Sequence, residues 1–173
     1  MEEMKMKKLI AIVCVLALCL GALTACMEKV DNSVDTSAPV GVALVYGETK
    51  IDVTVGQWEE KRTEIKTADV SLGNGKEYEF TGVTLADLMA IAGATDCTSI
   101  VVRSSDGWEA VVDAADAQAY KILITDGYVG GKAIPEDAGG PIKMVFPATE
   151  HPELNEKYDA YAWQWYVSEV EFR

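Results

Sequence analysis

The sequence contains few of the residues that build disulfides and metal centres. It has four cysteines and one histidine, His151, and it contains no CxxC pair, no GxGxxG pattern and no P-loop. A zinc site generally needs three or four well-placed protein ligands. Only Glu150, Glu153 and Asp159 accompany His151, and their spacing is irregular. This pattern favours a solvated loop, so we predict no metal site.

Basic residues are also scarce. Lysine and arginine number 15 against 28 aspartates and glutamates, which gives a net charge of −13. Nucleic acids and anionic lipid surfaces attract basic proteins, so this balance argues against both as partners. The acidic residues form no long run, and we interpret them as part of a solvated outer surface.

The apolar run near the start of the chain is too short to cross a membrane. It extends from Leu9 to Leu20, whereas a spanning helix needs ~20 apolar residues. Lys5, Lys7 and Lys8 precede it. A charged segment followed by a short apolar one is typical of an export signal. We therefore predict that residues 1–25 are a signal peptide.

The segment Leu23-Thr24-Ala25-Cys26 resembles the bacterial lipobox, whose cysteine receives a diacylglycerol. The resemblance implies that Cys26 is the lipid attachment site and that the protein is anchored to the cell membrane outside the cytoplasm. A plain secretory signal that happens to end in cysteine is the alternative. Cleavage would remove three lysines and two glutamates, so the net charge would become −14.

The predicted processing leaves one free thiol. Cys14 and Cys19 lie in the signal and Cys26 would carry lipid, so only Cys97 remains. No intramolecular disulfide can then form. Cys97 precedes an apolar segment, where a buried small side chain is common, and we expect structural burial. A reactive thiol is the alternative.

Residues 26–39 differ in composition from the rest of the mature chain. The sequence MEKVDNSVDTSAP after Cys26 is polar, lacks aromatic residues and ends in proline. We predict a flexible tether over residues 26–39. Residues 40–173 then form one domain, which is long enough to bury a core without disulfides.

The apolar pattern of the domain predicts many short strands and two helices. Thr84 and Asp87 have capping-box spacing and Gly93 supplies a stop, which predicts a helix over 84–92. Asp113 is expected to cap a second helix that runs to Tyr120. A helical turn is expected at 56–61. The predicted strands are 51–55, 63–72, 77–83, 99–104, 108–112, 121–125, 141–147 and 165–172. Strands and helices do not alternate regularly, so the predicted class is α+β, mostly β with two short helices.

Five short motifs follow one another in a familiar order. They are GVTLADLM at 82–89, SDGW at 105–108, GKAIP at 131–135, GPIKMVFP at 140–147, and a late tryptophan, Trp165. In this order they resemble the molybdopterin-binding domain of the sulfite oxidase family of oxidoreductases, over residues 53–172. The resemblance implies that family's mixed, mostly β fold. It also implies a pterin cofactor and a redox activity, although a fold does not bring its activity with it.

The resemblance further implies where a cofactor would bind. The family's metal-binding cysteine lies in a C-x-GN turn, and this chain has Ser71-Leu72-Gly73-Asn74 there. The family's arginine corresponds to Lys143, and its tyrosine falls on Gly127, beside Tyr128. The candidate cofactor-binding residues are therefore Ser71, Asn74, Asp106, Trp108, Tyr128 and Lys143.

Two departures count against molybdenum chemistry. To bind the metal, Ser71 would have to lose its hydroxyl proton, which a serine does far less readily than a thiol, whose pKa is about 8.5. Lys143 lacks the bidentate fork of arginine. Exported family members usually carry a twin-arginine signal and travel folded with their cofactor. The lysine-only signal here implies export in an unfolded state, which would strip a cofactor. The resemblance thus implies molybdopterin, and these features disfavour it.

Two further groups of residues suggest a binding surface. Gly139 and Gly140 could present amides to an anion, or they could form a tight turn before a buried strand. An aromatic-rich end could bind a flat ligand or a sugar, and alternation suggests Trp163 and Tyr166 as its exposed platform. The aromatic residues are Tyr158, Tyr161, Trp163, Trp165 and Tyr166.

Together these observations predict a surface lipoprotein whose domain is a non-catalytic binding or accessory module for a small-molecule ligand. One alternative is a pterin-dependent oxidoreductase or electron-transfer component with a membrane partner. A second alternative is a protein-interaction scaffold.

Overall fold

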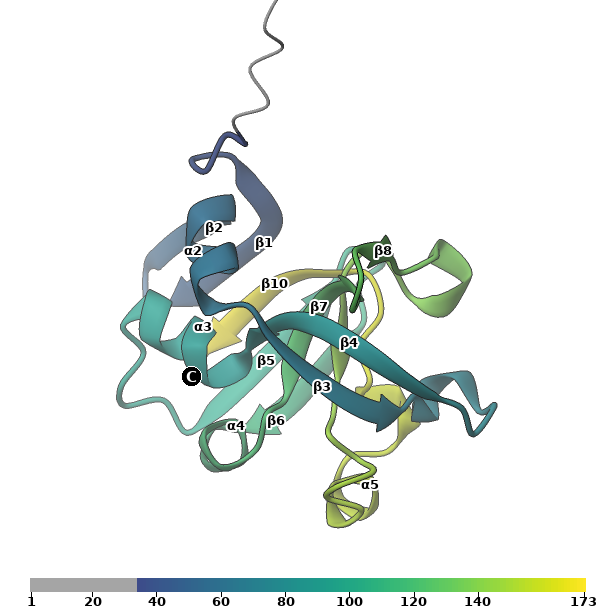
Figure 1. Cartoon of the computed structure of the whole chain (residues 1–173). Helices are drawn as coiled ribbons and strands as arrows, with labels where there is room; N and C mark the ends of the chain where they lie inside the picture. The colour runs from purple at the N-terminus through teal and green to yellow at the C-terminus, as the bar shows by residue number, and fades with distance from the viewer. Residues whose placement is uncertain (1–33) are drawn as a thin grey trace, which may run out of the picture. The chain divides into compact units, whose positions relative to one another are not determined.

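The computed structural model describes residues 34–173, and residues 35–173 form one compact unit (Figure 1). The predicted signal peptide and Cys26 lie outside the described residues. This unit begins at Asp35 and so includes the end of the segment predicted as a tether, residues 26–39. In that end the carbonyl of Thr36 accepts from the amide of Gly56 at 2.8 Å. No helix of the described part is long and apolar enough to cross a membrane.

The first sheet contains five strands in the order β2-β1-β10-β5-β6. β1 and β10 run parallel, and the other neighbours are antiparallel. Leu44 pairs with Val170, which in turn pairs with Val102, and all three side chains are buried. The sheet therefore joins the two ends of the domain. Its strands are β1 (Pro39–Tyr46), β2 (Thr49–Thr54), β5 (Ser99–Ser104), β6 (Glu109–Asp113) and β10 (Val167–Phe172).

The second sheet is built on a long β3–β4 hairpin, whose tip lies beside the 3-10 helix η3 (Ala160–Ala162) (Figure 1). β4 pairs with β7, and β7 also pairs with β8 and β9. Gly82 lets β4 approach β7 closely, because a Cβ there would lie 2.2 Å from the carbonyl oxygen of Ile124. The strands are β3 (Thr63–Ala68), β4 (Glu77–Thr84), β7 (Leu123–Tyr128), β8 (Lys132–Ala133) and β9 (Lys143–Val145).

Short helices connect the strands. Helix α3 (Leu85–Ala92) begins as predicted: the Thr84 hydroxyl accepts from the Asp87 amide at 3.0 Å, and Gly93 ends the helix in the left-handed conformation. Helix α4 (Ala114–Ala119) is also present, but the predicted side-chain cap is wrong. Asp113 makes no capping bond and instead binds Lys157 at 2.5 Å. The remaining helices are α2 (Val55–Lys61), α5 (Glu153–Lys157), and the 3-10 helices η1 (Val70–Leu72) and η2 (Glu136–Ala138).

The predicted α+β, mostly β class is confirmed. The described part contains α2 and α5 in addition to the two predicted helices, although α2 matches the helical turn expected at 56–61. The predicted strand 63–72 is too long, because Asp69 turns the chain into η1 after β3. Cys97 is 9% exposed, as its structural interpretation requires. Both sheets and α3 share one hydrophobic core, which includes Leu44, Phe80, Leu88, Val102, Ile124, Phe146 and Phe172.

Candidate functional site

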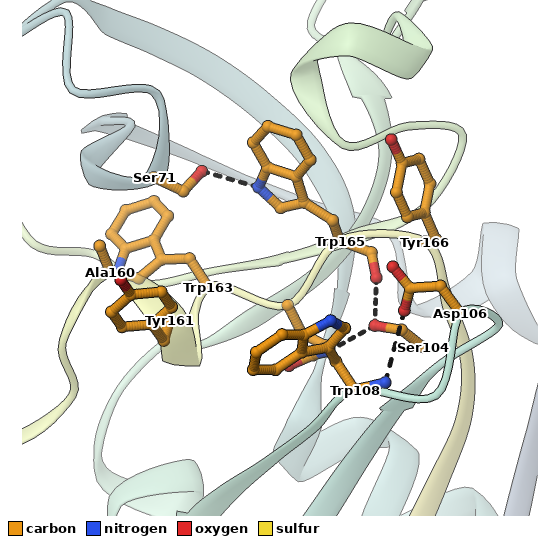
Figure 2. A pocket seen from close by; sticks show the side chains of 10 residues that line it. Ser71, Ser104, Asp106, Trp108, Ala160, Tyr161, Trp163, Trp165 and Tyr166 are labelled. Carbon is orange, nitrogen blue, oxygen red and sulfur yellow. Dashed lines mark hydrogen bonds between the residues drawn. The ribbon is translucent and has the colours of Figure 1, made fainter.

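A cavity of about 430 Å³ lies where the tip of the β3–β4 hairpin, the β5–β6 turn and the segment before β10 meet (Figure 2). Ser71 comes from η1, and Asp106 and Trp108 come from the β5–β6 turn. These segments are far apart in the sequence, so the cavity depends on the tertiary fold. The other lining residues are Ser104, Ala160, Tyr161, Trp163, Gln164, Trp165 and Tyr166.

The β5–β6 turn presents one aromatic ring and one carboxylate to the cavity. Gly107 has φ = 94°, a left-handed conformation that glycine adopts without a Cβ penalty. The amide of Ser104 donates to the carbonyl of Trp108 at 2.9 Å, which closes the turn. Trp108 remains 64% exposed. The turn therefore holds an exposed indole ring and the exposed Asp106 carboxylate at the cavity.

The segment before β10 supplies most of the aromatic wall. The side chain of Asp159 accepts from the Tyr161 amide at 3.0 Å and so begins η3. Tyr161 is 80% exposed. Tyr166 has φ = 52°, and its hydroxyl donates to the carbonyl of Glu136 at 3.1 Å. These bonds fix a segment that is largely irregular in its backbone.

Beneath the cavity, Ser71 belongs to a network of hydrogen bonds. Its hydroxyl donates to Asp69 Oδ1 at 2.6 Å. It accepts from Lys143 Nζ at 3.0 Å and from Trp165 Nε1 at 2.9 Å (Figure 2). A serine hydroxyl has one proton to donate and two lone pairs. All three positions of Ser71 are therefore occupied.

Lys143 is buried on the far side of this network. Its Nζ donates to Asp69 Oδ2 at 2.7 Å and to the carbonyl of Ala138 at 3.1 Å, and it lies 5.3 Å from the centroid of the Trp165 ring. Burial lowers the pKa of Lys143, and the nearby Asp69 carboxylate opposes that shift. The positive charge of Lys143 is thus paired inside the protein and does not face the cavity.

Gly139 and Gly140 form the tight turn before a buried strand, which was one of the two interpretations. The amide of Gly139 donates to the carbonyl of Glu136 and that of Gly140 to the carbonyl of Pro135. Neither amide is available to an anion. A Cβ at Gly139 would lie 2.5 Å from Cγ of Trp165. The glycine therefore makes room for the indole ring.

The structure brings together four of the six predicted cofactor-binding residues. Ser71, Asp106 and Trp108 line the cavity, and Lys143 lies behind it against the lining residues Ser71 and Trp165. Asn74 is exposed in the hairpin turn, where its side chain binds the hydroxyl of Tyr78 and the amide of Lys76. Tyr128 lies 5.6 Å from Tyr78, ring to ring, and lines a different cavity with Arg62 and Asp126.

The predicted exposed platform is wrong for Trp163. Its ring is only 2% exposed and packs 5.7 Å from Phe146, centroid to centroid. Under period-two alternation, position 163 shares a face with position 167, and Val167 is buried, so the pattern itself places Trp163 on the buried side. Tyr166 is half-buried. Ser104 and Gln164, which line the cavity, and Asp69, which lies behind Ser71, were missed, because no local pattern indicates that these residues meet.

A family model described as the oxidoreductase molybdopterin binding domain matches residues 48–151. The chain belongs to this family. The match includes Ser71, Asp106, Trp108 and Lys143, whereas the aromatic segment from Tyr158 to Tyr166 follows it. No curated relative matched the chain. The matched residues thus include the floor of the cavity and the β5–β6 turn, and most of the aromatic wall comes from residues that follow them.

Proposed function

We propose that this molybdopterin-binding-type domain is a non-catalytic binding or accessory module. The observation that carries the proposal is the hydrogen bonding of Ser71, which by the resemblance to the C-x-GN turn corresponds to the family's metal-binding cysteine. Its hydroxyl proton is donated to Asp69, and its lone pairs accept from Lys143 and Trp165. Binding a metal would require loss of the proton and of these partners. A serine alkoxide is also far harder to form than a thiolate.

The charges around the cavity also do not fit the cofactor. Molybdopterin carries a phosphate, and molybdenum in this family carries oxo groups, so the site would need positive charge. No lysine or arginine is among the lining residues, and the one charged side chain there is the Asp106 carboxylate. Lys143 is 0% exposed and pairs with Asp69. The residues present therefore do not match an anionic cofactor.

Metal analysis of protein purified from its own host tests this proposal. We expect molybdenum far below one atom per chain and no pterin fluorescence after denaturation. Stoichiometric molybdenum with a pterin would refute the proposal and support an oxidoreductase. A Ser71→Cys variant, grown and purified in parallel, separates two causes. If it loads with molybdenum, the missing thiolate alone prevents binding. If it stays empty, the charge of the cavity or export in an unfolded state contributes as well.

We further propose that the domain is held outside the cytoplasm, anchored to the bacterial cell membrane by lipid on Cys26. The lipobox-like Leu23-Thr24-Ala25-Cys26 and the lysine-only signal support this location. A Cys26→Ser variant should lose palmitate labelling and move from the membrane to the soluble fraction. Labelling that persists in this variant would contradict the assignment. Cys97→Ser is the matched control, because it removes a buried thiol outside the motif.

A further inference from the structure

The cavity gathers aromatic surface that the protein otherwise leaves in water. Trp108 is 64% exposed and Tyr161 is 80% exposed, and they come from different loops. In Figure 2 their rings and that of Trp165 lie around one open space, and Tyr166 also lines the cavity. Exposed aromatic rings contribute little to the stability of the fold. Several such rings that converge on one cavity are therefore typical of a binding site.

The polar groups of the cavity are negative in character. Asp106 is the single charged residue that lines it, and no basic side chain does. The faces of tryptophan and tyrosine rings also attract positive charge through their quadrupole. Within the same protein, Lys143 Nζ lies 5.3 Å from the Trp165 ring. The cavity therefore offers a cation both π faces and a carboxylate.

An unpartnered acceptor lies in the wall of the cavity. Gln164 is 4% exposed and lines the cavity, yet its Oε1 has no hydrogen-bond partner within the described part of the chain. Ser104 determines the orientation of this amide. The Ser104 hydroxyl donates its one proton to the carbonyl of Trp165, so it can only accept a hydrogen bond, and the group that donates to it is Gln164 Nε2. A buried polar atom without a partner is costly. This oxygen is enclosed by protein, so it acts on a bound cation only through its partial negative charge.

From these observations we infer that the cavity binds a small organic ammonium ion. Trp108, Tyr161 and Trp165 contact its positive head, and Asp106 balances its charge. The inference rests on the proposed function, because a bound molybdopterin would fill this space.

Titration with choline and with 3,3-dimethyl-1-butanol tests the inference. The two molecules have nearly the same shape and both carry a hydroxyl, but only choline is charged. Calorimetry at constant ionic strength, supported by tryptophan fluorescence, should show choline binding at least about tenfold more tightly than the neutral alcohol. Equal affinity would show an apolar site, and no binding of either up to about 10 mM would show no such site. Either result overturns the inference.

Single substitutions locate the binding. Trp108→Ala, Tyr161→Ala and Asp106→Asn should each weaken choline binding by about three- to tenfold. All three side chains are exposed, so the fold should survive, and circular dichroism checks this. Val111→Ala is the control, because Val111 is 57% exposed on β6 and does not line the cavity. Choline binding that all three variants retain would overturn the inference. The metal analysis is independent, so failure of choline binding in metal-free protein refutes this inference alone.

Discussion

The side chains of Asp69 and Lys143 form an ion pair, with 2.7 Å between Oδ2 and Nζ, and they are 1% and 0% exposed. Asp69 follows β3, and Lys143 begins β9. The pair therefore joins two distant segments of the second sheet at the floor of the cavity. Two buried charges are tolerated because each is paired and hydrogen-bonded.

Removal of one partner should be strongly destabilising. Lys143→Met leaves the Asp69 carboxylate buried without its cation, and we expect a loss of about 3–5 kcal/mol in the free energy of unfolding. Urea denaturation measures it. The double variant Asp69→Asn/Lys143→Met removes both charges and should recover at least about 1 kcal/mol of that loss. A double variant as unstable as Lys143→Met would show that packing, not the unpaired charge, dominates.

The bond between Ser71 and Trp165 should be measurable by a double-mutant cycle. Ser71→Ala leaves Trp165 Nε1 and Lys143 Nζ with one partner fewer, which should cost about 1–3 kcal/mol. Trp165→Phe removes the indole N–H, so Ser71→Ala should cost less in that background. Additive losses in the cycle would contradict an energetically significant bond between the two side chains.

Local sequence signals predicted the parts of the fold that local chemistry controls. Thr84 and Asp87 identified the start of α3, and the predicted strands 99–104 and 108–112 match β5 and β6 to within one residue. The pairing of β1 with β10 was not predicted, since it joins segments from opposite ends of the domain. Strand β8 has two residues, too few for a periodic pattern.

The candidate site was predictable only in part for the same reason. The family resemblance identified Ser71, Asp106, Trp108 and Lys143, because each lies in a recognisable motif. The partners of Ser71 were not predictable, because Lys143 and Trp165 lie 72 and 94 positions away in the sequence. Asn74 was selected as the asparagine of the C-x-GN-like turn, and Tyr128 as the neighbour of the position of the family's tyrosine. The hairpin turn and the pairing of β4 with β7 direct them elsewhere.

Acid should destabilise the first sheet through its surface carboxylates. A hydrogen bond from Arg173, helped by Arg103, lowers the pKa of Glu171 from 4.5 to about 2. Because the pKa is lower in the folded protein than in the unfolded chain, Glu171 contributes stability above about pH 4.5. That contribution decreases as the pH falls towards 2. Urea denaturation across this range should show the decrease, and Glu171→Gln should have a flatter profile. An unchanged profile in Glu171→Gln would assign the acid sensitivity to other carboxylates, such as Glu169.

Gly139 should tolerate no side chain while the Trp165 ring packs against it. Gly139 has φ = 90°, and an added Cβ would lie 2.5 Å from the indole ring, so Gly139→Ala combines backbone strain with a clash. Gly47→Ala is the matched control, because Gly47 has φ = 59° and open space around it. It should cost about 1–2 kcal/mol, the typical penalty of the left-handed conformation. Gly139→Ala should cost at least about 1 kcal/mol more.

In a Trp165→Ala background the excess should disappear, because the ring that the new methyl group would meet is gone. An excess that remains there would mean that the backbone around Gly139, not Trp165, requires the glycine.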